Sequence, residues 1–106
     1  MSAVIVRYKV KPDRVAENER LVRAVYEELA QMRPDGFRYA TFRAEDGRSF
    51  VHFAIVADGK ETPLPSLDSF QRFQREIAQR CEEQPVVSKL SEVGSYRLLE
   101  AVSAPA

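Results

Sequence analysis

Residues 37–57 read FRYATFRAEDGRSFVHFAIVA, and this stretch decides the fold. Apolar and polar residues alternate on both sides of Asp46-Gly47, which is typical of β-strands. An Asp-Gly pair favours the positive φ angles of a two-residue hairpin turn. The stretch therefore predicts two antiparallel strands, residues 37–44 and 49–57, joined by a tight turn.

The turn also predicts which side chains share a face of the sheet. If Glu45 pairs with Arg48, one face carries Phe37, Tyr39, Thr41, Arg43, Phe50, His52, Ala54 and Val56. The other face carries Arg38, Ala40, Phe42, Ala44, Val51, Phe53 and Ile55. Large apolar residues occur on both faces, whereas an antiparallel sheet with one solvated face has a polar side. We therefore expect both faces to be covered.

Upstream of the hairpin, the sequence predicts a strand followed by a helix. Residues 3–11 alternate in the same manner, and Pro12 ends the run. In residues 15–32 apolar positions recur every three or four residues, which predicts an amphipathic helix with Asp13 as its N-cap. The helix is expected to end at residues 34–36, Pro-Asp-Gly. Asn18 interrupts the apolar stripe, and a buried amide there would need hydrogen-bonding partners.

Downstream of the hairpin, a loop at residues 58–66 precedes a second predicted helix. Ser66 is its expected cap, and Pro85 marks where the helix must already have ended. Its apolar residues at helical spacing are Leu67, Phe70, Phe73, Ile77 and Cys81. A last strand is expected within residues 86–100, using Val93, Tyr96 and Leu98, with Gly94 as a bulge. Residues 101–106 are predicted to form a flexible tail.

The element order βαββαβ predicts one α+β domain over residues 1–100, with the ferredoxin-like fold. Its antiparallel sheet would carry both helices on one face. The other face is apolar, and the chain has no further element to cover it. A second copy of the chain is the simplest cover, so we expect a homodimer in the form of a dimeric α+β barrel.

This pattern of elements, closing on EVGSYRLL at residues 92–99, resembles the antibiotic biosynthesis monooxygenase superfamily. The resemblance implies homodimers whose sheets face each other, with a pocket between sheet and helices in each subunit. It also implies either cofactor-free oxidation of phenols or quinols, or degradation of haem. The haem-degrading branch uses a tryptophan, which this sequence lacks. We therefore expect no haem and no other cofactor, and a small aromatic ligand as the partner.

The candidate site residues come from the first strand, from the hairpin face that carries Tyr39 and His52, and from the two predicted helices. His52, the single histidine, could transfer a proton, and Tyr39 could act with it in catalysis. Tyr8 could donate to a ligand oxygen. Asn18, Val22 and Phe73 are expected to line the pocket from the helices. Each of these residue types is also an ordinary packing residue, so both interpretations stay open.

The composition argues against several classes of partner. Sixteen basic and sixteen acidic residues give no net charge, which argues against nucleic acid as a partner. One cysteine and one histidine cannot build a metal site of their own, and no apolar run approaches bilayer length. A cytoplasmic location is expected. Three functions stay open: a cofactor-independent monooxygenase acting on a small aromatic or quinol, a non-catalytic ligand-binding or interaction module, and a proton-transfer enzyme, such as an isomerase or dehydratase, with His52 as its base.

Overall fold

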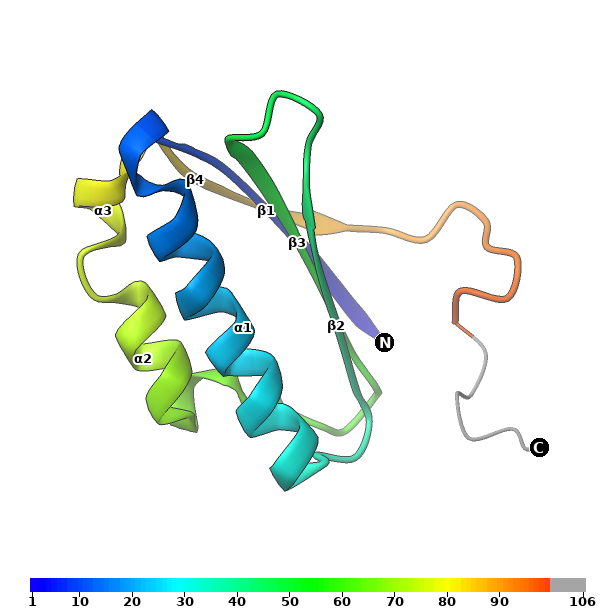
Figure 1. The fold of residues 1–106 in the computed structure, drawn as a ribbon. Helices are drawn as coiled ribbons and strands as arrows, with labels where there is room; N and C mark the ends of the chain where they lie inside the picture. The colour runs from blue at the N-terminus through cyan, green and yellow to red at the C-terminus, as the bar shows by residue number, and fades with distance from the viewer. Residues whose placement is uncertain (100–106) are drawn as a thin grey trace.

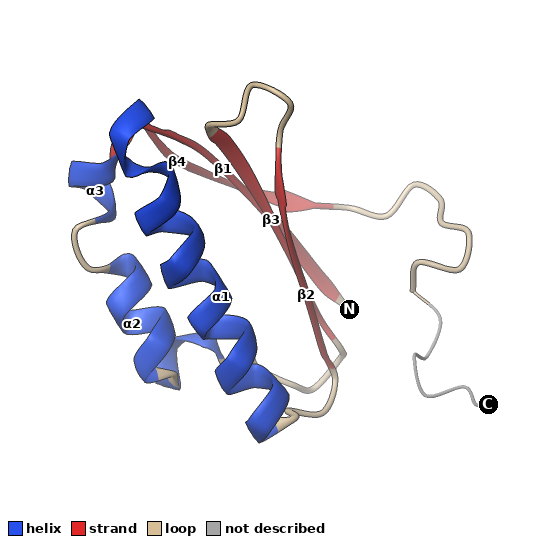
Figure 2. Ribbon diagram, viewed as in Figure 1, coloured by secondary structure: helices blue, strands red, loops and turns tan. Residues whose placement is uncertain are grey.

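The computed structural model describes residues 1–99 and has two layers, an antiparallel sheet and the helices that cover one of its faces (Figures 1 and 2). The elements in chain order are β1 (Ser2–Val10), α1 (Val15–Met32), β2 (Phe37–Arg43), β3 (Ser49–Val56), α2 (Asp68–Gln74), α3 (Ile77–Arg80) and β4 (Cys81–Leu90). The strand order is β2-β3-β1-β4. This is the ferredoxin-like α+β arrangement, so the predicted fold class is confirmed.

The β2–β3 hairpin has the predicted register but a different turn. Thr41 lies opposite His52, so the two faces of the hairpin are as expected. The Ala44 N–H donates to Ser49 O at 2.8 Å, and the Gly47 N–H donates to Ala44 O at 3.0 Å. The loop is therefore residues 45–48, and the expected two-residue turn is wrong. Because both loops have an even number of residues, the faces do not change.

Helix α1 ends where the sequence predicts, but it does not begin with the predicted cap. Asp13 does not cap the helix; it lies in a 3-10 turn, Pro12–Arg14, and α1 begins after Arg14 without a side-chain cap. At the other end Arg33 adopts a left-handed conformation with φ of 49°, and its N–H donates to Leu29 O at 2.8 Å. Proline lacks an N–H and therefore fits the first position of a helical turn, which explains why the 3-10 turn before α1 begins at Pro12.

The second helix is not continuous, contrary to the sequence prediction. It divides into α2 and α3 at Arg75 and Glu76, where Glu76 has a φ of 65°. The expected cap, Ser66, lies in the 3-10 turn Leu64–Ser66. Instead, the Glu28 carboxylate of α1 accepts hydrogen bonds from the Ser69 N–H at 3.0 Å and hydroxyl at 2.5 Å. A carboxylate from a neighbouring helix thus replaces the local cap.

The last strand begins earlier than predicted. Cys81 is its first residue and not the end of a helix, and Pro85 lies inside it, where the pairing between β1 and β4 is irregular. Val93, Tyr96 and Leu98, expected in this strand, lie beyond it and are 101%, 85% and 72% exposed. Gly94 therefore forms no bulge. The tail predicted at residues 101–106 lies outside the described residues.

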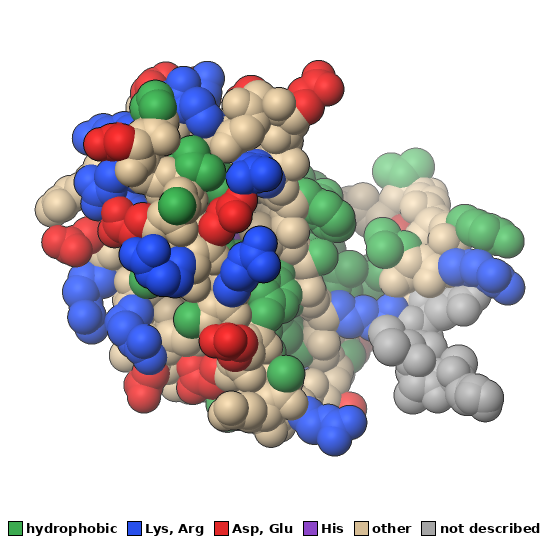
Figure 3. Space-filling model, viewed as in Figure 1, with side chains coloured by type: hydrophobic (Ala, Val, Ile, Leu, Met, Phe, Trp, Pro, Cys, Tyr) green, Lys and Arg blue, Asp and Glu red, His purple; other side chains and the backbone are tan. Residues whose placement is uncertain are grey.

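The core lies between the sheet and the helices, and the opposite face of the sheet is uncovered. The buried apolar residues are Tyr8, Val10, Val22, Val25, Phe50, Leu64, Leu67, Phe73 and Cys81. On the other face Phe42 and Val86 are 59% and 64% exposed. The helix side carries charged side chains of both signs (Figure 3). No helix within residues 1–99 is long and apolar enough to cross a membrane.

Candidate functional site

A cavity of about 410 Å³ lies between the sheet and the α2–α3 segment. Its apolar walls come from β1, β3 and β4 on one side and from α2 and α3 on the other; the residues include Val4, Val6, Ala54, Phe70, Phe73, Ile77 and Val87. The exposed residues Ser2, Lys60, Thr62 and Gln74 also line it and mark its opening. A mostly apolar cavity with few polar groups is the usual form of a small-molecule site.

Away from the opening, the polar groups in the cavity wall are Tyr8, Tyr39 and His52, which form one hydrogen-bonded cluster. The Tyr8 hydroxyl lies 2.8 Å from His52 Nε2, and the Tyr39 hydroxyl lies 2.8 Å from Nδ1. Thr41 Oγ1 is a second neighbour of Nδ1 at 3.0 Å. The register of β1, β2 and β3 brings the cluster together, because Val6 and Thr41 are the cross-strand partners of His52.

Burial weakens the basicity of the single histidine. His52 is only 4% exposed, and burial lowers its pKa to about 4, so the imidazole is neutral at pH 7. Burial also raises the pKa of the Tyr8 and Tyr39 hydroxyls, so both stay protonated. The site therefore offers neutral hydrogen-bond donors and acceptors to a ligand, and no strong base.

Two buried side chains extend the cluster away from the cavity. Asn18 of α1 is fully buried, and its Nδ2 donates to the Tyr8 hydroxyl at 2.9 Å. Its Oδ1 accepts from Nε of Arg80 at 3.1 Å. Arg80 is 1% exposed, and its guanidinium also donates to the Phe73 and Arg75 carbonyl oxygens. Neither Asn18 nor Arg80 lines the cavity.

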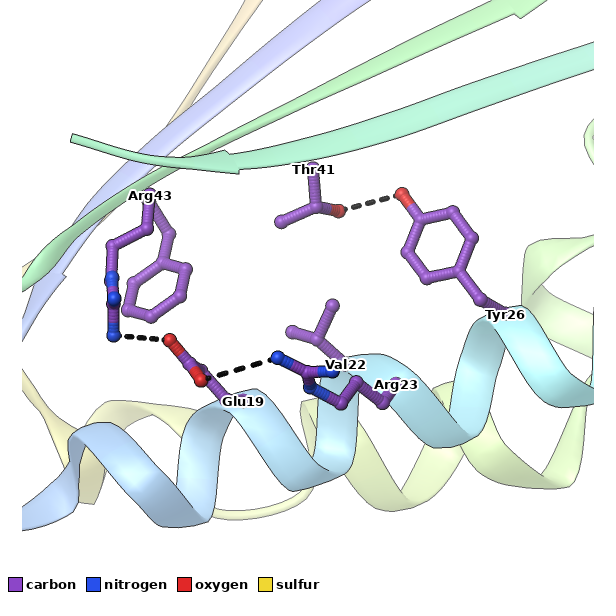
Figure 4. Close-up of a pocket in the computed structure, with 7 residues that line it drawn as sticks. Glu19, Val22, Arg23, Tyr26, Thr41 and Arg43 are labelled. Atoms are coloured by element: carbon purple, nitrogen blue, oxygen red, sulfur yellow. Dashed lines mark hydrogen bonds and ion pairs between the residues drawn. The ribbon is translucent and has the colours of Figure 1, made fainter.

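A second depression lies between α1 and the strands β2 and β3, with a volume of about 420 Å³ (Figure 4). Glu19 lies there between Arg23 and Arg43 and forms an ion pair with each. The Tyr26 hydroxyl points to Thr41 Oγ1 at 2.7 Å. Through Thr41 the cluster around His52 thus reaches the wall of this polar groove. Its charged groups already pair with one another, so we regard the apolar cavity as the better candidate.

The structure brings most of the predicted site residues together. His52, Tyr39, Tyr8 and Phe73 line the cavity. Asn18 and Val22 do not line this cavity: Asn18 lies behind Tyr8, and Val22 lines the polar groove between α1 and the sheet. Sequence reasoning missed Arg80 because the residue lies outside the apolar stripe of the predicted second helix, which runs through Phe73, Ile77 and Cys81. The left-handed Glu76, which turns α3, gave no signal in the sequence.

The comparisons with known proteins support the fold. No family model matches the sequence, and no curated protein matches it. An antibiotic biosynthesis monooxygenase of known structure superposes with a TM-score of 0.64 and 19% identity, over 89% of this chain and 100% of that one. A Nitrosomonas europaea protein given the same name provisionally superposes with a TM-score of 0.73 and 18% identity, over 89% and 100%.

A third structural neighbour is SnoaB from Streptomyces nogalater, which is described as a cofactor-independent oxygenase. It superposes with a TM-score of 0.66 and 19% identity, over 93% of this chain and 97% of that one. At these identities the likeness shows the fold alone. The chain therefore has the fold of antibiotic biosynthesis monooxygenase domains across most of its length.

Proposed function

We propose that this protein, which has the fold of antibiotic biosynthesis monooxygenase domains, is a cofactor-independent monooxygenase acting on a small phenol or quinol. The observation that carries the proposal is the apolar cavity of about 410 Å³ with Tyr39, Tyr8 and His52 as its polar wall. Such a cavity suits an aromatic ring with one or two oxygen substituents. The likeness to SnoaB, a cofactor-independent oxygenase, supports the same reaction class.

The substrate would supply all the electrons in this reaction. A hydroquinone and O₂ give a hydroxyquinone and water: one oxygen atom enters the ring, and the other leaves as water. The ionised substrate is the more electron-rich form, so a donor that stabilises a phenolate favours attack on O₂. Tyr39 is positioned to be that donor, since it lines the cavity and stays protonated. The apolar walls exclude water from the reacting atoms.

Oxygen uptake tests the proposal. With a panel of hydroquinones, in the presence of a chelator and without flavin, we expect the protein to raise oxygen consumption above the uncatalysed rate. Tyr39→Phe should slow turnover by about 10²-fold, the usual effect of removing one donor to a developing oxyanion. Tyr96→Phe is the matched control, because Tyr96 is 85% exposed and does not line the cavity. Uptake equal to autoxidation across the whole panel would contradict the proposal.

The alternative is a non-catalytic module that binds a small aromatic ligand in the same cavity. Binding without oxygen uptake would select it. The proton-transfer enzyme is disfavoured, because His52 has a pKa of about 4 and hydroxyl groups lie beside both of its ring nitrogens. A base with so low a pKa takes up a proton only weakly at neutral pH.

A homodimer belongs to the same proposal. The uncovered sheet face carries exposed Phe42 and Val86, and the segment after β4 carries exposed Val93 and Tyr96. This segment extends past the end of β4 (Figure 1), and its Leu98 carbonyl oxygen accepts a hydrogen bond from Arg38 of β2 at 3.0 Å. A second copy would cover both surfaces, and domains with this fold are typically dimeric. A cytoplasmic location stays a prediction.

A further inference from the structure

Arg80 is a buried cation whose hydrogen bonds lead toward the cavity. Among residues 1–99 no carboxylate forms an ion pair with it, although Glu17 on α1 is near enough to raise its pKa against the larger lowering effect of burial. Glu17 itself pairs with Arg14 at 2.6 Å. A buried charge held by neutral acceptors is costly, which suggests a role beyond packing.

Arg80 fixes the orientation of the Asn18 amide. A guanidinium has only donors, so the atom of Asn18 that lies 3.1 Å from Arg80 Nε must be the oxygen. The amide nitrogen then faces Tyr8, 2.9 Å from the hydroxyl oxygen, and donates to it. A flipped amide would set two donors against each other at Arg80. The direction of the Asn18–Tyr8 hydrogen bond is therefore determined.

The same reasoning favours one tautomer of His52. The partners that the structure shows for the Tyr8 hydroxyl are Asn18 Nδ2, which can only donate, and His52 Nε2 at 2.8 Å, so the Tyr8 hydrogen is satisfied when Nε2 accepts it. His52 Nε2 is then the acceptor, and the neutral ring carries its hydrogen on Nδ1. In this tautomer Nδ1–H has the oxygens of Tyr39 and Thr41 as its acceptors, at 2.8 and 3.0 Å. Tyr39 is then an acceptor toward His52, and its own hydrogen can go either to Thr41 or to a ligand in the cavity.

We propose that Arg80 is a positioning residue for the cavity: acting through Asn18, Tyr8 and His52, it directs the Tyr39 hydroxyl hydrogen toward an oxygen of the bound ligand. Each hydrogen bond in the chain points the same way, and hydrogen bonds in such a chain polarise one another. The cation at the far end adds to this polarisation. Thr41, which also interacts with Tyr39, is the described neighbour that competes for its hydrogen.

The series of hydrogen bonds from Arg80 to Tyr39 predicts the class of ligand. The Tyr39 hydroxyl is the last donor in a series that begins at the Arg80 cation. Such a donor favours an aromatic compound with an anionic or strongly accepting oxygen, so a phenolate should bind more tightly than the neutral phenol. This inference rests on the cavity of the proposed function and specifies its ligand. It requires binding only, so it can be tested without turnover.

The tautomer of His52 is the first test. Isotope-labelled histidine gives one set of ring-nitrogen resonances, because the chain has a single histidine. At neutral pH we expect an unprotonated Nε2 and a protonated Nδ1. In Asn18→Ala the link to Arg80 is lost, and the two tautomers should become mixed. A protonated Nε2 in the unaltered protein would overturn the inference, whatever the variants do.

Ligand binding is the second test. Titration with para-nitrophenol across its ionisation, followed by absorbance, should show phenolate bound roughly tenfold more tightly than phenol. Tyr39→Phe and Arg80→Met should both lose this preference, while neutral para-nitrotoluene binds them as it binds the unaltered protein. Arg72→Met is the matched control, because Arg72 is exposed on α2. Equal preference in Arg80→Met and the unaltered protein would refute the role of Arg80.

The two proposals fail in different ways. Phenolate preference without oxygen uptake would retain the inference and remove the monooxygenase. Oxygen uptake that is unaffected by Arg80→Met, with no phenolate preference, would retain the monooxygenase and remove the inference. Since Arg80 also binds two backbone carbonyls, its replacement could prevent folding. The tautomer of the unaltered protein decides the question in that case.

Discussion

At the scale of single residues, the site depends on keeping polar groups satisfied inside an apolar core. Asn18, His52 and Arg80 are all buried, and none of their side-chain polar atoms lacks a hydrogen-bond partner. Each unmade hydrogen bond there would cost about 1–3 kcal/mol, so the network holds its members in one arrangement. A residue that looks like a packing histidine is thereby fixed in a defined tautomer beside a cavity.

His52 should make stability depend on pH. Its folded pKa of about 4 lies below the ordinary value of 6.5, so the unfolded chain binds the extra proton between these two values. The free energy of unfolding should therefore be constant above pH 6.5 from this source and fall as pH drops toward 4. The total loss is about 3 kcal/mol.

Urea unfolding at several pH values measures this loss. In His52→Gln the fall in the free energy of unfolding between pH 6.5 and 4.5 should disappear, whatever the stability of the variant at pH 7. Carboxylates with lowered pKa values, such as Asp46 and Glu28, act at lower pH and should leave this window unchanged. Histidine resonances that titrate near pH 6.5 in the folded protein would contradict the prediction.

At the scale of elements, the break between α2 and α3 matters most for the site. A continuous helix through residue 81 would leave no early start for β4, which begins at Cys81. The break sets Arg80 at the end of α3, where its Cζ lies 5.3 Å from the centre of the Phe73 ring. The position of Arg80 thus depends on the break at the left-handed Glu76.

Glu76 should carry a measurable conformational cost. With a φ of 65° it occupies a region that glycine enters without steric penalty. We expect Glu76→Gly to raise the free energy of unfolding by up to about 1 kcal/mol. The matched control is Glu27→Gly in α1, which should lower it by about 1 kcal/mol, because glycine is unfavourable inside a helix. Denaturant unfolding measures the free energy of unfolding of both variants. Destabilisation by Glu76→Gly would show that the Glu76 side chain stabilises the fold by more than its left-handed backbone conformation costs.

At the scale of the whole molecule, the two sides of the sheet differ in kind. The helix-covered side encloses the core and the cavity, and the other side exposes apolar residues from β2 and β4. Contiguous exposed apolar surface usually marks an interaction site. The charged side chains visible on the helix side point to solvent there (Figure 3).

The exposed sheet face should be a dimer interface. Light scattering should give a mass about twice the 12.1 kDa of the chain. Phe42→Glu should give a monomer, since a carboxylate buried in an apolar interface is strongly unfavourable. Met32→Glu is the control: Met32 is similarly exposed at 55%, but it lies at the end of α1. A single-chain mass for the unaltered protein, or dissociation by both variants, would rule this interface out.

The sequence alone determined the register of the β2–β3 hairpin and the fold class, because alternation has a period of two and fixes faces wherever one side is buried. It also grouped Tyr39 with His52 and set Asn18 apart. The tertiary structure decided the rest. The helix break at Glu76 and the Glu28 carboxylate at Ser69 reflect contacts between distant segments, which override local propensity. Arg80 joined the site for the same reason: its partner Asn18 lies 62 positions away, and hydrogen bonding across that distance leaves no periodic trace in the sequence.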